Sequence, residues 1–229
     1  YWEAYWPGHN DEDRTANGYD ATINSPAVAN ATPAGTLATP AFNMNSTGWL
    51  TSTYPIARIA GESTVMIFAY LANQSETRIT GVGNPNQWLI STQSNQRCHH
   101  ASAGVTGVST SNSFRLANTW MLLDLTWSGT TRTLSRDIST TSSASTTYAS
   151  AGGTFHLGAN PSGTAPTGGY YAHVSTHTAA RSAAWRLTEY NAVLNPLLFS
   201  VAGTPEDLST PPVGFTPYFY QRFILGGAR

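Results

Sequence analysis

The chain of 229 residues is 40% hydrophobic, which is enough for one large all-β domain with a sizeable core. Only 10% of the residues are charged, against ~25% in an average soluble domain, so Ser, Thr, Asn and Gln must supply the polar surface. The net charge of −1 argues against nucleic-acid binding, no apolar run approaches the ~20 residues of a membrane span, and the single cysteine excludes an internal disulfide.

The first fifty residues contain three predicted strands. Alternating aromatic residues predict an edge strand over residues 1–6, and a polar, turn-rich loop follows at 9–18. Residues 19–23 predict the second strand. Residues 24–40 are Ala, Pro, Thr and Ser with little periodicity, which predicts a surface loop, and residues 42–50 predict a strand with a glycine turn.

The middle of the chain carries the clearest strand patterns. Residues 64–71 are apolar on both faces, as expected of a central strand covered on each side, and residues 88–90 are a further strand candidate. Residues 120–127 alternate as a half-buried strand, with one apolar face and a second face that carries Asp124 among apolar neighbours. A Ser-Gly turn then predicts a hairpin into residues 131–138.

The last predicted elements close the domain. Residues 155–158 and 170–175 read as strands, and they precede the one convincing helix, from residue 182 to about 194. Ser182 has the side chain of an N-cap, and a proline after the helix stops it. We expect Trp185 to pack on the end of the sandwich.

Two motifs carry a resemblance to a known family. The first is R-S-A-x-W-x-x-x-E-Y-N over residues 181–191, directly after the strand-like residues 170–174, and the second is D-x-x-x-N-G-x-D-A-T over residues 13–22. With these motifs the chain resembles a laminin-G-like, concanavalin A-like jelly roll over roughly residues 1–196. The resemblance implies an antiparallel β-sandwich with one short C-terminal helix, a kind of domain that usually binds or builds rather than catalyses.

The chain is predicted to divide into a sandwich over residues 1–207 and an extended tail over residues 208–229. The tail is aromatic and proline-spaced, and an apolar extension beyond a closed domain must bury its surface somewhere. It either packs on its own sandwich or forms an arm on a neighbouring chain, and both alternatives stay open. The candidate assembly residues are Phe215, Tyr218, Phe219, Tyr220, Arg222 and Phe223.

Acidic residues near the N-terminus are candidate calcium ligands. Asp11, Asp13 and Asp20 would supply the oxygen ligands that Ca²⁺ requires from a flexible loop. The loop lacks the regular spacing of a self-contained calcium motif, so distant loops would have to contribute. The alternative is a solvated turn in which Asp13 caps backbone amides. No other cofactor is indicated.

Aromatic residues are candidates for sugar binding. Their flat rings would stack on pyranose rings, while neighbouring Asn and Gln side chains would hydrogen-bond to sugar hydroxyls. A platform needs two or three exposed aromatics on one face, and the alternative is ordinary packing in the core or rim. The candidate residues are Trp2, Trp6, Trp49, Trp88 and Tyr54.

The sequence contains no recognisable catalytic motif, so we expect a protein that is not an enzyme. The paired carboxylates of glycoside cleavage, the Gly-x-Ser-x-Gly elbow and the phosphate loop are all missing. His173 and His177 would point to the same side of a strand, but about 13 Å apart, which is too far to chelate one zinc ion. A polar face of the sandwich is the better interpretation of these histidines.

Two functions compete on this basis. The first is a structural surface component of a large assembly, such as a phage capsid decoration or tail protein, located on the virion surface. Its partners would be other virion proteins and further copies of the chain, with additional contact to glycans. The second is a lectin-like carbohydrate-binding module of a secreted or cell-surface bacterial protein. The assembly function leads, mainly because of the tail at residues 208–229.

Overall fold

The computed structural model is an antiparallel two-sheet β-sandwich with one helix, as the sequence predicts. It describes residues 4–6, 8, 13–24, 27–31, 41–44, 48–55, 62–71, 77–82, 88–93, 97–102, 105–145, 154–158 and 168–194. Within these ranges, no helix is both long enough and apolar enough to cross a membrane.

The first sheet has eight strands in the described part of the chain, in the order β13-β12-β11-β6-β15-β4-β3, with β1 also paired to β15. The strands are β1 (Ala4–Trp6), β3 (Val28–Ala31), β4 (Ala41–Asn43), β6 (Ser63–Leu71), β11 (Trp120–Ser128), β12 (Thr131–Arg136), β13 (Thr140–Ser145) and β15 (Gly169–His177). Strand β6 lies between β11 and β15 and is buried on both faces, which confirms the central strand predicted at residues 64–71.

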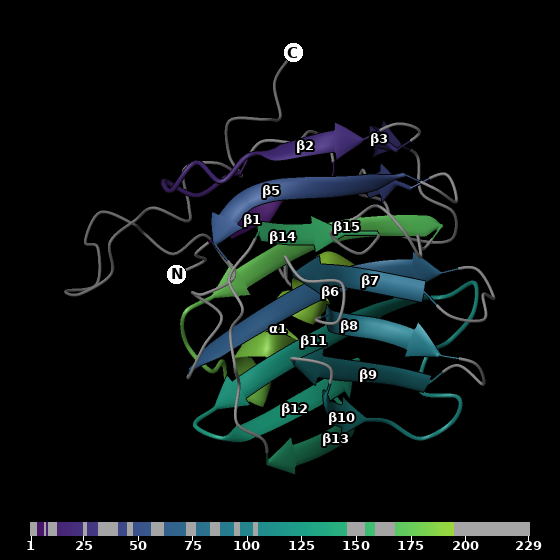
Figure 1. Cartoon of the computed structure of the whole chain (residues 1–229), viewed down its shortest axis with the longest axis vertical. Helices are drawn as coiled ribbons and strands as arrows, with labels where there is room; N and C mark the ends of the chain where they lie inside the picture. The colour runs from purple at the N-terminus through teal and green to yellow at the C-terminus, as the bar shows by residue number, and fades with distance from the viewer. Residues whose placement is uncertain are drawn as a thin grey trace, which may run out of the picture.

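The second sheet has seven described strands in the order β10-β9-β8-β7-β14-β5-β2. They are β2 (Ala21–Asn24), β5 (Trp49–Pro55), β7 (Thr77–Val82), β8 (Trp88–Gln93), β9 (Arg97–Ser102), β10 (Val105–Ser109) and β14 (Thr154–Leu157). In the view of Figure 1 this sheet runs from β2 at the top to β10 at the bottom.

The main core lies between the two sheets. Alternate residues of β11 (Met121, Leu123, Leu125 and Trp127) point into it from the eight-stranded sheet. The seven-stranded sheet contributes side chains such as Tyr54 and Phe155, whose rings meet edge to face at 6.4 Å between centroids. The period-two alternation of strands therefore delivers one apolar face of each sheet to a shared interior.

A second apolar cluster lies on the other side of the eight-stranded sheet, under helix α1 (Ala183–Leu194). Phe68 and Leu122 of the sheet pack there with Trp185 and Tyr190 of the helix. The helix begins as predicted, since the Trp185 amide donates to the Ser182 hydroxyl over 3.2 Å. The fold therefore has three layers: sheet, sheet and helix.

Two sequence predictions about these elements need correction, and strand β7 was missed. Strand β11 is not half-buried, because α1 covers the face that the alternation assigned to solvent. Residues 24–40 are not all loop, since β3 pairs with β4 from Val28 opposite Asn43 to Ala31 opposite Ala41. Strand β7 was not predicted either, and it joins β14 to β8 within the seven-stranded sheet. Backbone pairing sets these two strands, although their residues show little hydrophobic alternation.

The approach of Gly48 to Ala27 makes a testable prediction about stability. A Cβ at Gly48 would lie 2.3 Å from the backbone nitrogen of Ala27, so one of the two segments has to move. We expect Gly48→Ala to lower the free energy of unfolding by about 3 kcal/mol, as for overpacked interiors. Gly18→Ala is the control: its Cβ would meet nothing within 4 Å, and only its positive φ of 67° should cost about 1 kcal/mol. Urea unfolding measures both, and equal losses would contradict the steric explanation.

Candidate functional site

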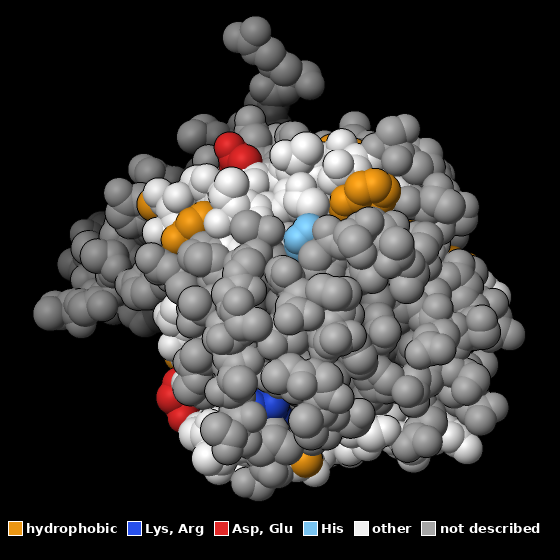
Figure 2. All heavy atoms as spheres, in the orientation of Figure 1, with side chains coloured by type: hydrophobic (Ala, Val, Ile, Leu, Met, Phe, Trp, Pro, Cys, Tyr) orange, Lys and Arg blue, Asp and Glu red, His pale blue; other side chains and the backbone are white. Residues whose placement is uncertain are grey.

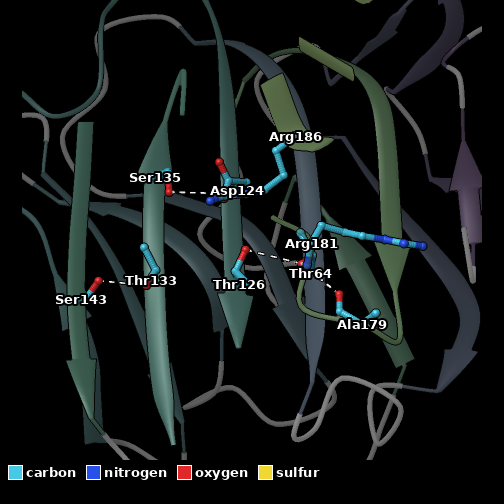
Figure 3. Close-up of polar contacts among 9 residues, drawn as sticks. All are labelled: Thr64, Asp124, Thr126, Thr133, Ser135, Ser143, Ala179, Arg181 and Arg186. Atoms are coloured by element: carbon cyan, nitrogen blue, oxygen red, sulfur yellow. Dashed lines mark hydrogen bonds and ion pairs between the residues drawn. The ribbon is translucent and has the colours of Figure 1, made fainter. Parts of the chain in front are cut away.

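A buried ion pair fixes helix α1 to the eight-stranded sheet (Figure 3). Arg186 of the helix pairs with Asp124 of β11 and also donates to the Ser135 hydroxyl of β12 over 3.1 Å. Burial raises the pKa of Asp124 to about 6, and the charge of Arg186 partly offsets that rise. In the sequence, Asp124 stands among apolar neighbours without a nearby charged partner. Its partner in the structure is Arg186 of the helix, 62 positions further along the chain. The pair joins the helix to the sheet.

The hydroxyl of Thr64 fixes the turn that leads into the helix. It donates to the carbonyl of Ala179 over 3.1 Å and accepts the amide of Arg181 over 2.9 Å, and Thr126 of β11 lies beside it (Figure 3). The guanidinium of Arg181 then lies 4.7 Å from the centre of the Trp185 ring. Trp185 therefore packs on the outer face of the eight-stranded sheet, and not on the end of the sandwich as predicted, because helix α1 lies across that face.

The two histidines of β15 lie in different surroundings on the helix side of the sheet. His173 sits at a β-bulge with a positive φ of 46°, and its Nδ1 lies 2.5 Å from the hydroxyl of Tyr5 in β1. His177 is fully buried against Trp185, with 4.9 Å between ring centroids, so the prediction of a polar face is wrong for this residue. Burial, and then the charge of Glu189, raise the pKa of Tyr5, so its hydroxyl stays protonated.

Asp13 organises the loop that the sequence proposed for calcium. One carboxylate oxygen accepts the amides of Tyr5 and Thr15, and the other accepts the amide of Tyr19 and the hydroxyl of Thr15. Its own amide donates to Asp20 over 2.8 Å. These bonds match the capping alternative, and no cluster of three His, Cys, Asp or Glu side chains occurs among the residues described. The calcium site stays a prediction, with Asp11 outside the described ranges.

The outward face of the seven-stranded sheet at β2 and β5 presents a different surface. Leu50 and Ser52 are buried toward the core, so Trp49, Thr51 and Thr53 point outward along the same strand. The register places Asn24 opposite Trp49 and Thr22 opposite Thr51, which brings both β2 side chains to that face. Thr22 and Thr53 are exposed, while Asn24, Trp49 and Thr51 are half-buried. We call these five residues the β2–β5 face.

The β2–β5 face combines one large aromatic ring, that of Trp49, with uncharged polar side chains. In Figure 2 the upper part of the molecule, where Figure 1 places β2 and β5, shows white groups with small orange hydrophobic patches, one red acidic patch and one pale-blue histidine patch. On the adjacent strand β14, His156 lies opposite Thr51 and is buried. Burial lowers the pKa of His156, so its imidazole stays neutral. This arrangement can stack a flat ligand on Trp49 and hydrogen-bond to it through hydroxyl and amide groups.

The structure separates the predicted sugar-binding residues. Tyr54 is fully buried in the core, so that prediction is wrong: its ring has no face to offer a ligand. Trp49 lies on the β2–β5 face, and Trp88 belongs to β8 of the same sheet. Trp6 belongs to β1 of the other sheet. Trp2 and the tail residues 208–229 lie outside the described ranges, so the predictions made for them are untested.

Sequence reasoning missed the polar members of the β2–β5 face. The signal was present in Trp49-Leu-Thr51-Ser-Thr53-Tyr, where a tryptophan and two threonines recur at period two. What the sequence could not indicate was which of its two faces lay outward. The sequence therefore selected Trp49 and Tyr54 together, although they lie on opposite faces of β5.

Comparison with known proteins identifies the fold. No family model matches the sequence and no curated protein matches it. Domain 4 of AbnA, a GH43 extracellular arabinanase from Geobacillus stearothermophilus in complex with arabinotriose, is a similar solved structure. The identity is 15% and the TM-score 0.62, over 82% of this chain and 97% of that one.

Two further similar structures are parts of longer chains. The receptor binding domain of the botulinum neurotoxin C/D mosaic serotype gives 10% identity and a TM-score of 0.62, over 82% of this chain and 50% of that one. Trypanosoma rangeli sialidase, in complex with the inhibitor DANA, gives 13% and 0.60, over 82% and 32%. At these identities the likeness shows the fold and does not single out the laminin-G-like type: the chain is a two-sheet antiparallel β-sandwich of the kind found in these proteins.

Proposed function

We propose that this chain is a non-catalytic carbohydrate-binding module of a secreted or cell-surface protein. The observation that carries the proposal is the β2–β5 face, where Trp49 stands half-buried among uncharged hydroxyl and amide side chains. Similarity to an arabinanase domain that was solved with arabinotriose supports the same conclusion, since nearly all of that domain is matched. The low charge of the chain, 10% of its residues, also fits neutral contacts better than electrostatic capture.

The geometry of Trp49 favours stacking on a sugar. An aromatic ring offers a large, rigid contact area, and a ring that is already half-buried loses little conformational freedom on binding. The hydroxyls of Thr22, Thr51 and Thr53 can both donate and accept, which matches the mixed demands of sugar hydroxyls. Asn24 is oriented by its own hydrogen bond, since Nδ2 donates to the carbonyl of Thr22 over 3.2 Å.

The assembly function stays a prediction without support. It rested on the tail at residues 208–229, which lies outside the described ranges. Neither the similar structures nor the described contacts point to a virion. Catalysis also gains no support, because the likeness to the arabinanase and the sialidase extends only to the fold.

Removing the Trp49 ring tests the proposal. We expect Trp49→Ala to weaken glycan binding at least tenfold, a loss of about 1.4 kcal/mol or more in binding free energy, because the stacking surface disappears. Binding is detected on a glycan array that includes arabinotriose, and affinities are then measured by calorimetry. Trp49→Phe should retain part of the affinity, because it keeps an aromatic face.

Leu187→Ala provides the control for a surface change elsewhere. Leu187 lies on α1, 45% exposed, on the opposite side of the molecule from the β2–β5 face. This variant should bind like the unaltered protein. A wild-type protein that binds no glycan, or a Trp49→Ala protein that binds as tightly as wild type while remaining folded, would refute the proposal for this face.

A further inference from the structure

We infer that the β2–β5 face recognises a neutral oligosaccharide rather than a single sugar or an acidic glycan, with Asp20 as its polar anchor. The inference rests on the proposed carbohydrate binding and assigns that site its class of ligand. It depends on three features: the place of Asp20 beside β5, the distance from Asp20 to Trp49, and the charge that Asp20 brings to the face.

Asp20 lies at the end of the face that is opposite to Trp49. It directly precedes Ala21, whose partner in the ladder is Ser52, so the same register places Asp20 beside Thr53. The side chain of Asp20 is exposed, and its Oδ1 accepts the amide of Asp13 over 2.8 Å. That hydrogen bond orients the carboxylate without burying it. An ionised carboxylate oriented in this way accepts hydroxyl hydrogens of a sugar through charge-assisted hydrogen bonds.

The distance between the two ends of the face sets the size of the ligand. Trp49 and Thr53 are four residues apart on β5, which corresponds to about 13 Å along an extended strand. Thr51 lies between them on the same face, with Thr22 opposite it on β2. One sugar stacked on Trp49 cannot reach Asp20, whereas a chain of about three sugars spans the interval and meets the threonine hydroxyls on its way.

The charge of Asp20 sets the class of ligand. Two like charges about 4 Å apart repel by about 1 kcal/mol even in bulk water, so a carboxylated sugar is disfavoured at this end of the face. The five side chains of the β2–β5 face carry no formal charge, so none of them offsets that repulsion. Neutral glycans meet the same carboxylate only as a hydrogen-bond acceptor.

The substitution Asp20→Asn tests the effect of the Asp20 charge without changing the structure of its loop. Asparagine keeps the Oδ1 acceptor for the Asp13 amide, so the loop and the melting temperature should be unchanged, while the negative charge is lost. The probes are pairs of equal length on one array, galactobiose with digalacturonate and galactotriose with trigalacturonate, together with arabinose and arabinotriose. We expect wild type to prefer the neutral member of each pair by about fivefold or more, and Asp20→Asn to reduce that preference to within about twofold. Arabinotriose should bind at least tenfold more tightly than arabinose.

The outcomes separate this inference from the proposed function. The inference is overturned if the wild-type protein binds the acidic glycans as tightly as the neutral ones. It is also overturned if folded Asp20→Asn keeps the wild-type preference for neutral glycans. In both cases the carbohydrate-binding function stands. Equal affinity for arabinose and arabinotriose overturns the predicted ligand length. Wild-type protein that binds none of the probes refutes both proposals together.

Discussion

Replacing Arg186 with methionine is expected to lower the free energy of unfolding at pH 8 by about 3–5 kcal/mol, because it leaves a buried carboxylate without its counter-charge. The carboxylate is that of Asp124, which is fully buried between β11 and the helix. Methionine keeps much of the length and apolar volume of the arginine stem, so the loss reports mainly the missing charge and its hydrogen bonds. Urea unfolding measured by circular dichroism gives the value.

A second substitution provides the control for that experiment. The double variant Arg186→Met with Asp124→Leu removes both charges, and buried ion pairs replaced by apolar side chains are often neutral or more stable. We expect the double variant to recover most of the loss. A double variant as unstable as Arg186→Met would show that packing, not the unpaired charge, accounts for the loss.

The pH dependence of Arg186→Met has a definite sign. Burial already raises the folded-state pKa of Asp124 to about 6, and removal of Arg186 removes the interaction that offsets that rise. The folded variant therefore holds the Asp124 proton at pH values where the unfolded chain has released it. Its stability is greatest at about pH 4 and falls as the pH rises through 6 and above. The gap to wild type should widen with pH, and a constant gap would contradict this explanation.

Truncation of Trp127 to alanine is the second large expected effect. Trp127 is 1% exposed and is the largest of the fully buried side chains in the described ranges. It faces the core between the sheets, and loss of a buried tryptophan typically costs about 3–5 kcal/mol through lost burial and the cavity that remains. We expect the melting temperature and the denaturant midpoint to fall together.

The conservative variant distinguishes packing from a general defect at this position. Trp127→Phe leaves a smaller cavity than Trp127→Ala and should keep at least half of the stability that Trp127→Ala loses. Loss of glycan binding is not expected for Trp127→Phe, since the side chain lies inside the sandwich and Trp49 lies on its outer face. Equal destabilisation by alanine and phenylalanine would contradict the cavity explanation.

The elements that the sequence predicted correctly are those with strong local patterns. The hairpin of β11 and β12 follows from the alternation in residues 120–127 and the Ser-Gly turn after it, and the ladder from Leu123 to Ser128 confirms it. The helix follows from the Ser182 cap. Strands β3 and β7 were missed because their residues carry no such alternation, and hydrogen bonds to partners that are distant or weakly patterned establish them.

The candidate site was predicted only in part for a related reason. Alternation in β5 separates Trp49 and Tyr54 onto opposite faces, but it does not reveal which face meets the other sheet. The register of β5 with β2 decides this, and it also brings Asn24 and Thr22 beside Trp49 and Thr51. None of these pairings has a local signature in the sequence.

The sequence by itself determined the central strand and the closing helix, because hydrophobic periodicity and capping act over a few neighbouring residues. The sandwich itself was implied by the resemblance of two motifs to a known family. Only the tertiary structure decided that Asp124 has a partner in Arg186, that Asp13 caps amides of its own loop, and that Trp49 lies outward while Tyr54 is buried. Those outcomes depend on which strands pair, in which register, and on where the helix packs. They are contacts between segments far apart in the chain, and no local pattern encodes them.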